Sequence, residues 1–187
     1  AALASNPFLQ GLLLFFDLAG SRFDADLLLE LFENRAFQER QGLSGDDLEL
    51  FRGWMRDARV RGGWGSVQGN WTEGLRRILL GLAYLLPGEE IRNLDLGQAD
   101  KLETFLQLLK TLRELSESLR SEIKRTLREW AAHLNEVVEA LFKPQNGEKE
   151  LLCSFLGKIS TASERFSRSL FSWPLLHSLF KDACESE

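Results

Sequence analysis

The chain has 187 residues, a formal net charge of −5 and a hydrophobic content of 44%, values that suit one large globular domain or two small ones. Leu, Glu, Arg and Ala are abundant, and this composition favours helices over strands. The negative net charge speaks against an autonomous, tight nucleic-acid binder, and no apolar run reaches the roughly 18 residues that a membrane-spanning helix needs.

The chain begins at Ala1, and its only methionine is Met55. We therefore expect an internal piece of a longer protein. No basic residue precedes the apolar run at residues 12–16, so a secretory signal peptide is not predicted. Cys153 and Cys184 are too few for a disulfide framework and match no zinc or redox motif, which indicates a reducing, cytoplasmic location.

Capping signals and apolar spacing predict several short helices in the first half. Asn6 followed by Pro7 predicts a helix that runs to about Ala19 and stops at Gly20 in the left-handed conformation. Further helices are expected from Asp24, over residues 36–41 up to Gly42, from Ser44 with Asp47 as a capping box, and from Thr72 to the Pro87–Gly88 stop. Residues 59–70 read RVRGGWGSVQGN and are predicted to form a loop.

Two long helices are predicted next, at about residues 98–118 and 121–142, because apolar side chains recur there every three or four positions. We expect these helices to pair with or extend one another. Residues 144–147 mark a boundary before further helices, the last bearing Leu175, Leu176, Leu179 and Phe180. The predicted fold is all-α, an irregular multi-helix domain with a long helical pair. Residues 1–88 and 89–187 are its two parts, expected to form one compact unit.

A search for catalytic, metal and nucleotide motifs gives no specific match. The glycine-rich loop lacks GxxxxGK[ST], so an ATP site is not predicted. His177 and Cys184 share a helix face but are too sparse for a closed metal site. The acidic pairs at 46–47 and 89–90 are interpreted as helix-start and turn residues. We predict no catalytic residue, no cofactor and no metal.

One segment combines arginines with interleaved tryptophans. Arginine binds phosphate and aromatic rings stack on bases, a mixture typical of single-stranded nucleic-acid binding. The alternative is structural, because Trp54 falls on an apolar helix face and arginines at four-residue spacing often pair with acids. The candidates for nucleic-acid or subunit contact are Arg52, Arg56, Arg59, Arg61, Trp64, Trp71, Arg76 and Arg77.

Several segments, taken in order, resemble a known family. They are NPFLQGLLLFFDLAGSRFDADLLLELF, DDLELFRGWM, GNWTEGLRRILLGLAY, GQADKLETFLQLLKTLRELSESL and TLREWAAHLNEVVEALF. Over residues 6–142 the chain resembles RecC, the gamma subunit of exodeoxyribonuclease V in the bacterial RecBCD helicase-nuclease. It differs from family members in the central loop, where Gly62 and Gly63 separate Arg61 from Trp64.

The resemblance implies a subunit built like a superfamily 1 helicase that has lost its ATPase motifs and carries helical insertions. Such a subunit acts in double-strand-break repair and recombination, supports the motor subunits and channels a DNA strand, while nuclease and ATPase activities lie in other subunits. This chain would then be a non-catalytic scaffold and DNA-handling domain, monomeric when isolated, with the beta and alpha subunits and DNA as partners.

The alternative is a free-standing helical adaptor that binds another protein through residues 98–142 and never meets DNA. An adaptor of this kind is expected to leave a large exposed apolar face and to self-associate. An excised domain is instead expected to be monomeric and to carry a basic patch.

Overall fold

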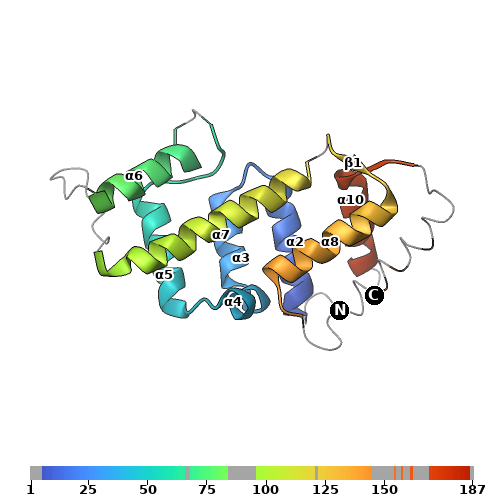
Figure 1. The fold of residues 1–187 in the computed structure, drawn as a ribbon, viewed down its shortest axis with the longest axis horizontal. Helices are drawn as coiled ribbons and strands as arrows, with labels where there is room; N and C mark the ends of the chain where they lie inside the picture. The colour runs from blue at the N-terminus through green and yellow to red at the C-terminus, as the bar shows by residue number, and fades with distance from the viewer. Residues whose placement is uncertain are drawn as a thin grey trace.

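A computed structural model describes residues 6–65, 68–83, 96–120, 122–144, 154, 157, 161 and 169–185. Its elements are α2 (Pro7–Gly20), α3 (Ala25–Glu33), α4 (Arg35–Gln41), α5 (Gly45–Asp57), α6 (Trp71–Ala83), the short 3-10 helix η1 (Leu96–Gln98), α7 (Ala99–Ser118), β1 (Lys124–Arg125), α8 (Leu127–Leu141), β2 (Phe171–Ser172) and α10 (Trp173–Glu185). Within these ranges β1 and β2, paired antiparallel, are the only strands. The all-α prediction is confirmed (Figure 1).

Side-chain caps start the first helices where they were predicted. The side-chain Oδ1 of Asn6 accepts a hydrogen bond from the N–H of the third residue of α2, and the Asp24 carboxylate accepts two from N–H groups in the first turn of α3. Ser44 and Asp47 form the predicted capping box of α5, in which each side chain accepts from the other's backbone N–H. These caps satisfy N–H groups that no helical carbonyl reaches.

The end of α2 and the start of α6 differ from the predictions. Gly20 is itself helical, and α2 ends because the following Ser21 is extended, so the predicted left-handed stop at Gly20 was wrong. Helix α6 begins at Trp71 rather than Thr72, because the Asn70 side chain accepts from the Glu73 N–H at 2.8 Å. Asn is the stronger N-cap residue of the two candidates.

The second long helix is shorter than predicted. Lys124 and Arg125 are extended in β1, and α8 begins only at Leu127, where Thr126 and Glu129 form a capping box. Helix α7 packs mainly on α2, and α8 packs on α4 and β1. The two long helices contact each other where the Ser118 hydroxyl at the end of α7 lies 2.6 Å from Nε2 of His133 in α8, while their larger helix–helix contacts are with α2 and α4 of the first half.

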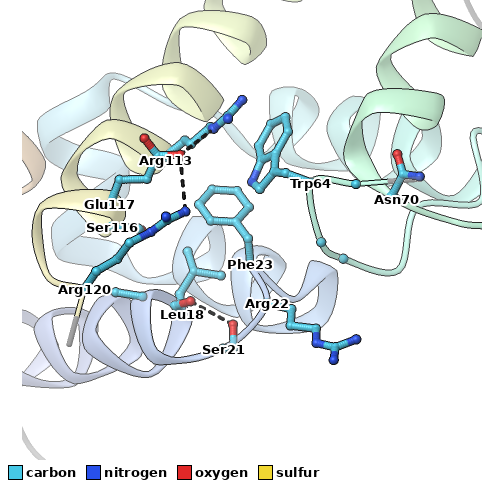
Figure 2. Close-up of a pocket in the computed structure, with 14 residues that line it drawn as sticks. Leu18, Ser21, Arg22, Phe23, Trp64, Asn70, Arg113, Ser116, Glu117 and Arg120 are labelled. Carbon is cyan, nitrogen blue, oxygen red and sulfur yellow. Dashed lines mark hydrogen bonds and ion pairs between the residues drawn. The ribbon is translucent and has the colours of Figure 1, made fainter. Parts of the chain in front are cut away.

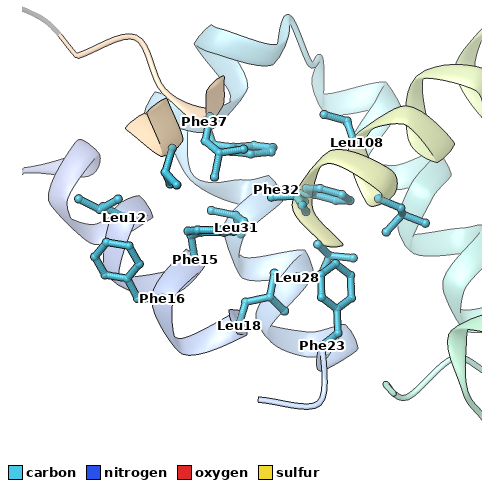
Figure 3. Packing of buried hydrophobic residues seen from close by; sticks show 14 of the residues in the cluster. Leu12, Phe15, Phe16, Leu18, Phe23, Leu28, Leu31, Phe32, Phe37 and Leu108 are labelled. Carbon is cyan, nitrogen blue, oxygen red and sulfur yellow. The ribbon is translucent and has the colours of Figure 1, made fainter. Parts of the chain in front are cut away.

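A single hydrophobic core joins both parts of the chain. Figure 3 shows Phe15, Leu28, Leu31 and Phe32 of α2 and α3 turned toward one another. Phe105 of α7 joins them, and like Phe32 it is fully buried. Burial of each such ring contributes roughly 1.5–3 kcal/mol. The predicted boundary at residue 88 lies outside the described residues and stays a prediction.

The C-terminal helix starts earlier than expected. Trp173 and Pro174, predicted to form a turn, are the first residues of α10. The Trp173 ring lies 4.6 Å from the Phe16 ring and 5.6 Å from the Trp130 ring, measured between ring centroids. These contacts attach α10 to α2 and α8. None of the described helices has the length and apolar character that crossing a membrane requires.

Candidate nucleic-acid and partner interface

The glycine-rich loop is held against the turn between α2 and α3. The Ala25 N–H donates to the Arg61 carbonyl at 3.0 Å, and the Trp71 N–H donates to the Gly63 carbonyl at 2.8 Å. A Cβ atom at Gly62 would lie 3.2 Å from the Phe23 carbonyl oxygen, and Gly62 and Gly63 both have positive φ. Glycine is needed because the backbones approach closely in a conformation that side chains disfavour. This loop carries two of the predicted arginines, the exposed Arg59 and Arg61, together with the half-buried Trp64.

Three of the predicted arginines are already paired within the domain. Arg52 forms ion pairs with Glu33 of α3 and Glu49 of its own helix. Arg77 pairs with Glu73 at 3.3 Å, and its Nη1 also donates to the Ala58 carbonyl at 3.4 Å. Arg56 lies 3.4 Å from its neighbour Asp57 and stays 72% exposed. Arg52 and Arg77 thus link neighbouring elements of the domain, and the paired carboxylates partly neutralise their charges.

The remaining arginines are exposed and form no ion pair with an acidic side chain within the described ranges. They are Arg59, Arg61 and Arg76, and together with Arg56 we call them the arginine edge. The edge spans the end of α5, the loop and α6. Because Arg77 of α6 contacts the Ala58 carbonyl, these pieces are adjacent. In Figure 1, α6 and the preceding loop form one end of the upper border of the molecule.

The two predicted tryptophans have different surroundings. Trp71 is 0% exposed, and its indole N–H donates to the Phe23 carbonyl at 2.7 Å. A buried ring cannot contact DNA or another subunit, so Trp71 is a structural residue. Trp64 is half-buried, stacks on Trp71 with 5.9 Å between ring centroids, and has the Arg113 guanidinium 4.3 Å from its own ring centroid. With two neighbours on its ring, Trp64 has little free surface on which a base could stack.

A pocket of about 370 Å³ lies beside Trp64. It is bounded by the end of α2, the glycine-rich loop and the second half of α7, and we call it the Trp64 pocket. Figure 2 shows Arg113 of α7 and Arg120, which follows the end of α7, meeting at Glu117, with Arg120 extending toward the Phe23 ring. Their nitrogens lie 3.0 and 3.6 Å from the Glu117 carboxylate oxygen. Both arginines are substantially exposed, at 44% and 64% of their side chains.

The sequence did not predict that α7 contributes to this surface. The spacing of Arg113, Glu117 and Arg120 indicates ion pairs along one helix face. Nothing in that spacing indicates that the face meets Trp64, because the contact depends on how α7 crosses the loop. Arg22 was missed for the same reason. It lines the pocket and is exposed, and Figure 2 shows it pointing away from Glu117.

Neither histidine lines the Trp64 pocket. His133 has its Nε2 2.6 Å from the Ser118 hydroxyl and its Nδ1 3.3 Å from Glu136. His177 stacks on Trp173 with 5.8 Å between ring centroids. Burial lowers the pKa of both imidazoles below the ordinary value. Among the residues that the structure describes, no group of three or more His, Cys, Asp and Glu side chains is arranged to hold a metal.

The fold and this surface define an all-α domain that presents exposed arginines beside a small pocket. A family model described as the fourth domain of the RecBCD enzyme subunit RecC matches residues 5–187, so the chain belongs to this family. The match continues past Phe142, where the resemblance recognised in the sequence ended, and it includes the C-terminal helix.

A curated relative agrees with this assignment. The chain is similar to the RecBCD enzyme subunit RecC of Mycolicibacterium smegmatis, with 26% identity over 162 residues. The aligned region covers 75% of this chain and 14% of that protein. The chain thus corresponds to a small part of its relative's length.

Proposed function

We propose that this chain is a non-catalytic scaffold and DNA-handling domain of a RecBCD-type complex, and that the arginine edge contacts DNA phosphates. The observation that carries the proposal is the contrast among neighbouring arginines. Arg52 and Arg77 are paired with carboxylates, whereas Arg59, Arg61 and Arg76 are exposed without such a pair among the described residues. Unpaired guanidinium groups are suited to phosphate because they give up no internal ion pair on binding.

Membership of the RecC family supports the cellular context of this proposal. A RecBCD-type complex would provide the alpha and beta subunits as partners and would bring DNA to the domain in the cytoplasm. Nuclease and ATPase activities would belong to other parts of that complex. The packed helices would serve as the scaffold that holds the arginine edge in position.

The adaptor alternative is less well supported by the packing. It requires the apolar stripes of residues 98–142 to be available to another protein. Leu102, Phe105 and Leu112 of α7 are 0–3% exposed, and Leu134 and Val137 of α8 are 0–2% exposed. These stripes are used in the domain's own core, so they cannot also bind a second protein.

The test is fluorescence anisotropy of a labelled forked duplex at low and moderate salt. The edge variant combines Arg59→Glu, Arg61→Glu and Arg76→Glu. The control variant combines Arg40→Glu, Lys143→Glu and Lys181→Glu, which are exposed positions on α4, after α8 and on α10. Both variants change the net charge equally, so a difference in their DNA affinities shows that the position of the charge matters. Circular dichroism checks that each variant folds.

We expect the parent to bind in a salt-sensitive manner and the edge variant to bind at least about 10-fold more weakly than the control variant. The slope of log affinity against log salt should fall by roughly one for each lost phosphate contact. Equal weakening of both variants would show that only total charge matters and would refute the edge as a DNA contact. Absence of parent binding at low salt would also count against it.

A further inference from the structure

Helix α10 carries apolar side chains on its outer face as well as on its inner face. Trp173 and Phe180 are 4% and 1% exposed, and their rings lie 4.6 and 5.6 Å from the Phe16 ring of α2 between centroids. On the outer side, Leu175 and Leu179 stand one helical turn apart and are each 50% exposed. We call these two side chains the leucine face. A helix that is apolar all round, as α10 is over these first two turns, is typical of a buried position.

The segment around the leucine face also lacks charge. Residues 169–180 contain no Asp, Glu, Lys or Arg, whereas the exposed positions of α8 include charged residues such as Glu136 and Glu139. Leu170, which precedes β2, is 59% exposed. Among the residues that the structure describes, three of the four exposed large apolar side chains therefore lie within residues 170–179. Such a concentration on one segment, without interspersed charge, indicates a contact surface.

The exposed leucines are too few for a stable complex between separate chains. Leu170, Leu175 and Leu179 together offer on the order of 200 Å² of apolar surface, whereas a stable interface between two proteins buries roughly 800 Å² on each partner. A domain of the same polypeptide needs less surface, because the covalent link gives it a high effective concentration at the leucine face. An uncharged apolar surface is also more typical of permanent contacts than of transient ones.

The family of this chain and the position of α10 agree with a contact of this kind. The family is described as the fourth domain of RecC, and the chain aligns with 14% of the length of its curated relative. A polypeptide of that kind has further domains that are covalently joined to this one. Figure 1 shows α10 and α6 at opposite ends of the molecule. A domain seated on the leucine face therefore leaves the arginine edge free.

We infer that the leucine face is a permanent contact with another domain of the same polypeptide, which presents an uncharged apolar surface to Leu175 and Leu179. The inference rests on the part of the proposed function that places this chain within a RecC-type polypeptide. It goes beyond that function because it assigns a protein contact to a surface that has no part in DNA binding.

The test measures the rate at which a maleimide labels the variants Leu175→Cys and Leu179→Cys. Each variant is prepared in the 187-residue chain and in the full-length RecC-type polypeptide, without other subunits. Glu139→Cys is the matched control, because this residue is exposed on the neighbouring helix α8. Trypsin releases peptides of residues 169–181 and 129–148, neither of which has a cysteine of its own. Mass spectrometry therefore reads each introduced cysteine separately, and circular dichroism checks that each variant folds.

We expect similar labelling rates at all three positions in the 187-residue chain. In the full-length polypeptide both leucine-face positions should be labelled at least about 10-fold more slowly, because a buried thiol reacts only when the contact opens, while Glu139→Cys changes by less than about threefold. The edge variant defined above, introduced into both proteins, should leave these rates unchanged. Failure of the DNA proposal and failure of this inference can thus be told apart.

Four outcomes would overturn the inference. The first is equal labelling of the leucine face in the two proteins. The second is equal slowing at Glu139→Cys, which would indicate a general loss of access to the domain. The third is slowing in the 187-residue chain as its concentration rises, which would assign the face to a second copy. The fourth is slowing only after the alpha and beta subunits are added, which would assign it to a separate chain.

Discussion

Two aromatic clusters in this domain have similar rings but different neighbours. In the core, Phe105 lies 4.9 Å from Phe51 and 5.7 Å from Trp54 between centroids, and all three side chains are fully buried. Beside the pocket, Trp64 stacks on the buried Trp71 at 5.9 Å but meets the Arg113 guanidinium as well. The core rings exclude charge, whereas the Trp64 ring holds a charge at the surface. An aromatic residue near arginines is therefore not by itself a sign of nucleic-acid binding.

The largest predicted effect is in the core. Phe105→Ala should lower the free energy of unfolding by about 3–5 kcal/mol, because it leaves a cavity among rings that cannot close around it. Urea denaturation measures this loss. Leu79→Ala, at a side chain that is 45% exposed, is the control and should cost far less. Comparable losses for the two variants would mean that the core rings are not tightly packed.

The elements that the sequence predicted correctly depend on local signals. Asn6, Asp24 and Ser44 cap helices because each side chain reaches backbone N–H groups within three residues. The glycine-rich loop was predicted because glycine tolerates the positive φ values that occur there. Such features need no knowledge of the rest of the fold.

The pairing of helices was not predictable in the same way. The apolar stripes of α7 and α8 show that each helix has a buried face, but a stripe does not specify its partner. Sequence proximity suggested that the two helices pair with or extend one another, whereas their largest observed helix–helix contacts are with α2 for α7 and with α4 for α8. The Trp64 pocket was missed for this reason, since it forms only where α7 crosses the loop.

The second prediction concerns a charge at the border of the core. Asp47 is 4% exposed, and its carboxylate pairs with Lys101 of α7 at 2.7 Å. Burial raises the pKa of the Asp47 carboxyl, but hydrogen bonds from Lys101 and Ser44 outweigh this effect and hold the pKa below its ordinary value of 3.8. The charged form thus stabilises the fold, unlike the exposed ion pairs around the pocket, which contribute little.

Asp47→Asn should lower the free energy of unfolding by about 1–3 kcal/mol at neutral pH. A carboxyl with a lowered folded-state pKa contributes its full stabilisation above the unfolded value, and loses it as the pH falls through the folded value. The difference between parent and variant should therefore shrink as the pH falls below about 4. Urea denaturation across this range measures it. Asp46→Asn, at the exposed neighbour, should show no comparable loss, and a pH-independent difference would contradict the proposed role of the charge.

The smallest predicted effect tests whether Trp64 holds Arg113 in place. A double-mutant cycle of Trp64→Leu and Arg113→Met should give a coupling of about 0.5–1 kcal/mol in the free energy of unfolding. Trp64→Leu paired with Arg40→Met, which lies outside the contact, should give a coupling near zero. Because Arg113 also binds Glu117, the cycle is repeated with Glu117→Gln to remove that ion pair. A coupling that survives this change belongs to the ring contact itself. A coupling that disappears would assign it to the ion pair, and Trp64 would then resemble the core rings in acting only through packing.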